Sequence, residues 1–175
     1  MNFSKHALLL VFFSGTCFSA PWRHTFHVST DIDINRFYNH NITSVLLEHP
    51  SMTAVFNKKT STFNALNTRL TVETNIPMSN NGYTHNIRMM EKQNQCFDSG
   101  NNQILTSNEQ ESFNQLLVSG TPVPLNKDIN LGGFSDSKNS FKAQSHEISV
   151  TFSPLDPSVV RYCHGSLKLT VSLDL

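Results

Sequence analysis

The last segment of the chain, Cys163 to Leu175, alternates strictly between apolar and polar side chains from Ser166 onward. Period-two alternation is typical of a β-strand with one buried face. We expect this strand to be paired and packed to its end, because an open apolar edge would fray and aggregate. The residues expected on its buried face are Leu167, Leu169, Val171, Leu173 and Leu175.

A second alternating segment, His24 to Asn35, lies near the other end of the chain. One of its faces carries Phe26, Val28, Thr30, Ile32 and Ile34. Alternating apolar strands at both ends of a secreted chain favour a subunit that polymerises by exchanging strands.

The first residues are predicted to be a signal peptide, residues 1–19. Lys5 precedes an apolar run, Ala7 to Phe13, that is too short to span a bilayer, which needs about 20 apolar residues. Cleavage after Ser19 would leave about 155 residues, the size of one domain. Basic and acidic residues balance, 13 of each, and no charged tract indicates a nucleic-acid partner. We expect a protein secreted through the periplasm.

Two cysteines remain after cleavage, Cys96 and Cys163. In an oxidising compartment such a pair predicts a disulfide, and two free thiols are the alternative. The bond would close a loop of about 66 residues and stabilise the fold by roughly 3–5 kcal/mol on the chain-entropy account. Because Cys163 lies at the start of the last strand, we expect Cys96 on or beside the neighbouring strand, with the Cα atoms about 4.4–6.8 Å apart.

The middle of the chain predicts more strands and one short helix. Alternating or apolar segments run over 44–49, 53–57, 66–74, 83–91 and 146–153. Ser107 fits a helix N-cap with Gln110 completing a capping box, and Phe113, Leu116 and Leu117 form an apolar stripe that ends before Gly120. Strands of this length and spacing favour an all-β sandwich.

No motif for metal binding or catalysis stands out. The chain has eight histidines but no Cys-x-x-Cys or His-Glu-x-x-His spacing, and His24 and His27 fall on opposite strand faces, so we expect surface histidines and no metal or cofactor. Asp31 and Asp33 share a strand face. Two neighbouring carboxylates on an exposed strand face more often serve solvation than acid–base chemistry. Nucleophile-elbow and phosphate-loop motifs are missing from the sequence, so we expect no catalytic residues and no enzyme.

The order of these features resembles a known family. The stretches Val45 to Asn75, NQILTSNEQESFNQLL at Asn102 to Leu117 and YCHGSLKLTVSLDL at Tyr162 to Leu175 are similar to the alpha clade, or colonisation factor antigen type, of chaperone–usher fimbrial pilins. The resemblance covers nearly the whole mature chain as pattern and order. The cysteine pair departs from what we expect of major subunits of this clade.

The resemblance implies an incomplete immunoglobulin-like β-sandwich that is completed by donor-strand exchange. Residues 20–35 would form the N-terminal donor strand, with Phe26, Val28, Thr30, Ile32 and Ile34 filling the groove of a neighbouring subunit, and residues 36–175 the pilin domain. The strand from Leu167 to Leu175 would form one wall of that groove and pair with a periplasmic chaperone.

The partners implied by the resemblance are neighbouring copies of the chain in a homopolymer, the chaperone, an outer-membrane usher and a host-cell receptor, with the subunit in a surface fimbrium that supports adhesion. Two alternatives remain, one structural and one functional. In the structural alternative, the segment from His24 to Asn35 is the first strand of a closed sandwich. In the functional alternative, the protein is a monomeric secreted binding domain, adhesin-like or lectin-like, that does not polymerise.

Overall fold

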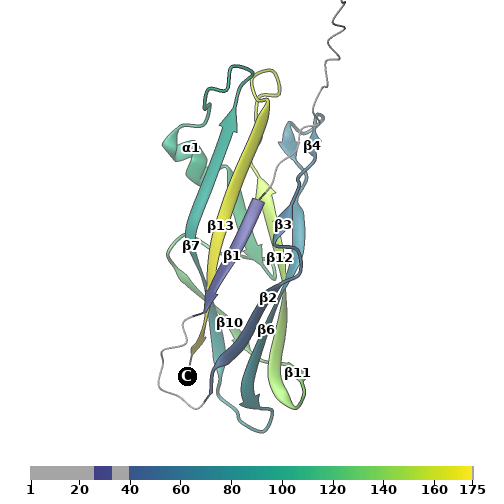
Figure 1. Ribbon diagram of the computed structural model, residues 1–175, viewed down its shortest axis with the longest axis vertical. Helices are drawn as coiled ribbons and strands as arrows, with labels where there is room; N and C mark the ends of the chain where they lie inside the picture. The colour runs from purple at the N-terminus through teal and green to yellow at the C-terminus, as the bar shows by residue number, and fades with distance from the viewer. Residues whose placement is uncertain (1–25, 33–39, 175) are drawn as a thin grey trace, which may run out of the picture.

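Two β-sheets packed face to face make up the protein (Figure 1). The computed structural model describes the backbone of residues 26–32 and residues 40–174. The predicted signal peptide, residues 1–19, therefore lies outside the described residues. The expected all-β sandwich with one short helix is confirmed.

The first sheet has the order β10-β7-β13-β1-β3. Its strands are β10 (Asp128–Gly133), β7 (Thr84–Phe97), β13 (Tyr162–Asp174), β1 (Phe26–Ile32) and β3 (Ser51–Met52). Its pairs are antiparallel except that β1 runs parallel to β13. Figure 1 shows β7, β13 and β1 side by side in this sheet.

The second sheet has the order β2-β6-β12-β8-β9, with β11 paired to one end of β12. Its strands are β2 (Ile42–Leu47), β6 (Leu66–Pro77), β12 (Phe141–Phe152), β8 (Asn114–Val118), β9 (Thr121–Pro122) and β11 (Asp136–Lys138). A small hairpin, β4 (Phe56–Asn57) and β5 (Thr62–Phe63), joins neither sheet by backbone pairing and packs on the end of β12 through Phe63.

The core lies between the sheets and is built from alternate residues of the long strands. The period-two patterns of the segments 66–74 and 146–153 predict the buried faces of β6 and β12 correctly. The fully buried members of the core include Leu70, Val72, Ile76, Ile87, Leu116, Val118, Ile148, Val150, Leu167, Leu169 and Val171. Burial of one such side chain contributes roughly 1.5–3 kcal/mol, so this layer supplies most of the drive to fold.

A bulge in β7 changes which residues of that strand face the core. β13 places Leu169 opposite Met89 and Lys168 opposite Glu91, so Met90 has no partner in the ladder. Odd-numbered residues of β7 are buried before the bulge and even-numbered ones after it. An extra residue in one strand has this effect because the side chains alternate with a period of two. The phase change turns the cysteine near the end of β7 towards the core.

The helix is shorter than predicted. α1 spans Ser107–Ser112, and its N-cap is Thr106 rather than Ser107, with Glu109 rather than Gln110 completing the capping box. Residues from Asn114 onward form β8 because their alternate side chains are buried against the sandwich and their backbone pairs with β12. Tertiary pairing thus overrides the helical stripe read from Phe113, Leu116 and Leu117. Within the described part of the chain, no helix has the length and apolar character to cross a membrane.

Two histidines meet between the sheets, which corrects the expectation that the histidines lie at the surface. His85 of β7 is fully buried and His146 of β12 is 5% exposed. Their Nε2 atoms are 2.7 Å apart, and the Ser119 hydroxyl lies 3.2 Å from Nδ1 of His146. The ring of Phe134 stacks on His85 with a centroid distance of 4.5 Å. One imidazole must donate and the other accept in this bond, so the pair holds at most one proton beyond neutrality.

Burial, together with the charge of His146, lowers the pKa of His85 from 6.5 to about 4. Burial also lowers the pKa of His146, against an opposing effect of Asp136. Both rings are therefore neutral at pH 7 and resist protonation while the sandwich is closed. The meeting of a histidine from each sheet has no signature in the sequence.

We predict that the free energy of unfolding falls as the pH drops from 7 to 5. The unfolded chain binds protons with the ordinary histidine pKa, above the folded value, so acid favours unfolding in this window. His85 accounts for up to about 2 kcal/mol of this loss. Chemical denaturation at several pH values measures it. A double variant, His85→Gln with His146→Gln, should lose most of the pH dependence, whereas His164→Gln, at an exposed position, should keep it. Equal slopes in all three proteins would contradict the assignment.

Candidate functional site: the strand position beside β13

The C-terminal strand β13 forms the fixed wall of the site. It pairs with β7 along its whole length, from Tyr162 opposite Phe97 to Asp174 opposite Thr84. Leu167, Leu169 and Val171 are 0–1% exposed, as their alternation predicts, and Leu173 is partly buried against the core. The fifth residue of the predicted row, Leu175, lies outside the described residues.

The other side of β13 is occupied by β1 of the same chain (Figure 1). The two strands run parallel, and the register places Val28 beside Leu167, Thr30 beside Leu169 and Ile32 beside Val171. Every second residue of β1 is therefore in register with a buried residue of β13. A groove along this row would otherwise leave apolar side chains and unpaired backbone groups open to water.

The outer edge of β1 has much less support. Its partner on that side, β3, pairs through Phe26 with Met52 and through His27 with Ser51. Within the described strands, the rest of β1 therefore pairs on one side only, with β13. Parallel pairs are also slightly less stable per residue than antiparallel pairs. β1 is consequently held in its sheet mainly by its seven-residue parallel pairing with β13.

Four of the five residues predicted for the donor face, Phe26, Val28, Thr30 and Ile32, lie in β1, and Ile34 lies outside the described residues. In the structure this strand lies beside β13 of its own chain, whereas the donor-strand hypothesis places it beside β13 of a neighbouring subunit. The closed-sandwich alternative requires the strand to stay beside β13 of its own chain. The two hypotheses differ in which chain supplies the strand.

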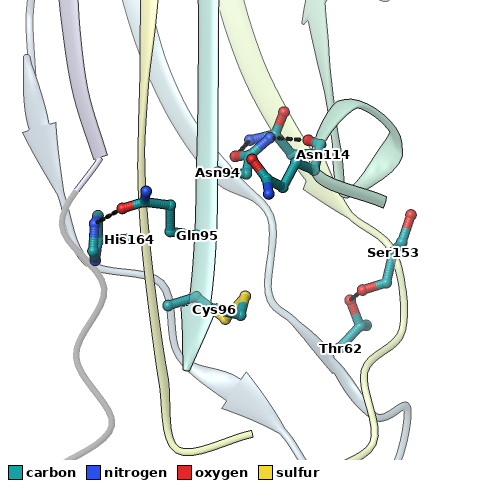
Figure 2. Close-up of a disulfide and its surroundings, with 9 residues drawn as sticks. Thr62, Asn94, Gln95, Cys96, Asn114, Ser153 and His164 are labelled. Atoms are coloured by element: carbon teal, nitrogen blue, oxygen red, sulfur yellow. Dashed lines mark hydrogen bonds between the residues drawn. A yellow bond between two sulfur atoms is a disulfide. The ribbon is translucent and has the colours of Figure 1, made fainter. Parts of the chain in front are cut away.

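A disulfide fixes the start of β13 to the end of β7. Cys96 and Cys163 are bonded, which confirms the predicted pairing and its place on neighbouring strands (Figure 2). Their Cα atoms are 3.9 Å apart, closer than the 4.4–6.8 Å predicted. The two residues face each other directly in the ladder, and the Cys96 carbonyl accepts from Ile104 on the opposite side. Directly opposed residues that do not hydrogen-bond to each other have the shortest Cα separation in an antiparallel pair.

Polar side-chain contacts stabilise this end of the sheet on both faces. On the core side, Asn114 donates to the Asn94 side chain at 2.6 Å, and Asn94 in turn donates to the Gln110 carbonyl of α1. On the outer side, Gln95 and His164 are joined at 2.7 Å, as Figure 2 shows. β7 and β13 are therefore joined at the disulfide end by a covalent bond as well as by their backbone ladder and side-chain contacts.

The histidines and acidic residues form no metal site in the part of the chain that the structure describes. It contains no group of three or more His, Cys, Asp or Glu side chains that could hold a metal ion. His24 and Asp33 lie outside the described residues. The features that sequence reasoning missed are the bulge at Met90 and the pairing of His85 with His146, and neither has a spacing signature.

No protein-family model matches the chain, and no curated protein matches it. One similar solved structure is that of the CooA pilin subunit from enterotoxigenic Escherichia coli. It is 13% identical, and the similarity covers 70% of this chain and 88% of that chain with a TM-score of 0.41. A similarity of this extent does not establish a common function.

We predict that removing the disulfide with the double variant Cys96→Ala and Cys163→Ala lowers the free energy of unfolding by about 2–5 kcal/mol, because the unfolded chain regains the entropy of a long loop. Urea denaturation of the mature protein measures the change. Ser172→Ala, an exposed position on the same strand, should change it by less than about 0.5 kcal/mol. Two free thiols in the unreduced wild-type protein, seen by mass spectrometry, would contradict the bond itself.

Proposed function

We propose that the chain is a structural subunit of a surface fimbria, assembled by the chaperone–usher route through donor-strand exchange, and that the fimbria supports adhesion to host cells. In this proposal residues 20–35 are the donor segment and residues 36–175 the pilin domain. The single observation that carries it is the strand position beside β13, which is filled by an N-terminal strand that runs parallel to β13 and is in register with a buried apolar row.

Physical chemistry explains why such a subunit needs partners. Without β1, the edge of β13 from Gly165 to Val171 would lose its backbone partners beside a buried apolar row, and unpaired backbone groups next to apolar surface are costly in water. An edge of this kind pairs readily with any available strand. A periplasmic chaperone that lends a strand keeps the subunit soluble, and the outer-membrane usher is where the lent strand is replaced by the next subunit's residues 20–35.

Exchange between copies fits the energetics of a strand that belongs to the same fold. A strand that moves from its own subunit to a neighbour re-forms the contacts it leaves, so the exchange costs little free energy. Each subunit then gives one strand and receives one, which is a head-to-tail contact that extends into a fibre. The resemblance of the segments 45–75, 102–117 and 162–175 to alpha-clade pilins supports the same assembly route.

A monomeric secreted binding domain is the second candidate. The observation that favours it is that β1 completes the sheet of its own chain. In that case the segment from His24 to Asn35 belongs to a closed sandwich, and the adhesin-like or lectin-like surface lies elsewhere. Light scattering of the purified mature protein over a range of concentrations separates a constant monomer mass from growing polymers.

Deletion of residues 24–35 should abolish fibre formation and leave a subunit that still binds its chaperone. The receiving groove is intact in this variant, but nothing remains to enter the groove of the next subunit. Electron microscopy of fibres and co-purification with the chaperone measure the two properties. Fibres at the wild-type yield from this deletion would show that the segment is not the donor.

Synthetic peptides spanning residues 24–35 should displace the chaperone from a purified chaperone–subunit complex. A peptide with Ile32→Asp should fail, because it places a charge at the register position beside Val171, where an unpaired charge costs several kcal/mol. A matched peptide with Asp31→Asn should act like the wild type, since Asp31 is in register with Thr170, which is only partly buried. Equal displacement by all three peptides would contradict the register assigned to β1 against β13.

A further inference from the structure

A pocket of about 720 Å³ opens between the two sheets on the edge away from β1. Its apolar lining comes from Met89 of β7, Leu116 of β8, Phe152 of β12, and Val123 and Leu125 of the segment after β9. Pockets for small molecules in proteins are roughly 300–1,000 Å³ and mostly apolar with a few placed polar groups. The volume of this pocket falls within that range, and its lining combines apolar and polar residues in nearly equal number.

The pocket exists because strand pairing along the outer edge of β7 stops part-way along that strand. β10 pairs with β7 from Gly133 opposite Thr84 to Asp128 opposite Arg88, and an isolated bridge from Met89 to Leu125 continues that contact. Beyond the bulge the same edge of β7 is approached by α1 instead of a strand. The pocket lies between these two covers, over the apolar floor of the sandwich.

Lys92 places a positive charge in the wall of this pocket. Its ammonium group donates to two main-chain carbonyls, those of Glu111 and Asn114, each at 2.5 Å. An ammonium has three hydrogens, so one donor remains. Both acceptors are uncharged, and the described residues provide no carboxylate in a direct ion pair with Lys92.

Burial lowers the pKa of Lys92, against an opposing effect of the Glu111 carboxylate. The charge is half-buried, where the attraction of a partner of opposite charge is screened less than in bulk water. Lys92 and Glu111 are the charged residues that line the pocket. A single cation with a carboxylate near it suits a monoanion better than a polyanion, because the carboxylate repels additional negative charge.

We propose that this pocket binds a small amphipathic monoanion, with its carboxylate on Lys92 and its apolar body over Phe152, Pro124 and Leu125. A medium-chain fatty acid has this chemistry. The geometry requires no displacement of β1, which lies at the other edge of the sheet. The site is therefore independent of strand exchange, and a ligand can occupy it in a monomer or in a fibre.

The test is binding of dodecanoate to the full mature protein, followed by isothermal titration calorimetry, with 1-dodecanol as the uncharged analogue of equal chain length. Dodecanoate should bind at one site and raise the melting temperature, and dodecanol should bind at least about tenfold more weakly, which corresponds to the loss of one charge-assisted contact. Equal binding of the two compounds would overturn the role of the charge, and lack of dodecanoate binding would overturn the site.

Variants locate the binding. Lys92→Met should weaken dodecanoate binding about tenfold or more. The control Lys168→Met removes a lysine of β13 whose ammonium lies 3.6 Å from the Glu91 carboxylate of β7, and it should leave binding unchanged. Leu125→Glu, at a position 40% exposed in the pocket wall, should also block binding and leaves the Lys92 hydrogen bonds in place. Undiminished binding to a folded Lys92→Met or Leu125→Glu protein would place the ligand elsewhere and contradict the proposal.

Discussion

A strand inside a sheet needs a hydrogen-bonding neighbour on each side, and the two neighbours of β13 are unequal. On one side β7 pairs with it over its whole length and is joined to it by the disulfide. On the other side β1 pairs over seven residues, in parallel, with little support beyond. The buried row of β13 requires cover from both. We propose that the first neighbour is permanent and that the second is replaced during assembly.

The disulfide, the bulge and the polar contacts at the end of β7 act together on this arrangement. The extra residue at Met90 shifts the phase of β7, so that Cys96 meets Cys163 on the core side and Asn94 reaches α1 through Gln110. A loop closed by a disulfide is stabilised mainly because the unfolded chain is constrained. The disulfide therefore stabilises the pairing of β13 with β7, which under the proposed function is the wall that receives the donor strand.

Much of the fold was predictable because it depends on alternation. The segments 66–74, 146–153 and the C-terminal strand each bury one face, and period two is enough to find that face from residue types. The disulfide was predictable because two cysteines leave a single pairing. The Cα separation was not, since it depends on the two residues being directly opposed in the ladder. The helix was placed correctly at its start to within one residue, but its second half is β8, because Leu116 and Val118 gain more from packing against the sandwich than from a helical stripe.

The features that escaped prediction all depend on contacts between elements far apart in the chain. His85 and His146 are separated by sixty-one residues and meet only when the two sheets close. The pocket at Lys92 arises because β10 stops short and α1 covers the remaining edge, which is a property of chain paths rather than of any local pattern. The pairing direction of β1 is of the same kind: alternation identifies the strand but carries no information on whether it runs parallel to its partner.

The most direct test of the central claim is an electron cryomicroscopy map of the protein as assembled on the cell surface, at a resolution that traces the backbone. The account predicts fibres in which the density beside β13 continues into the pilin domain of the adjacent subunit. Density that leads back into the same subunit, or a protein that remains monomeric on the surface, would contradict it.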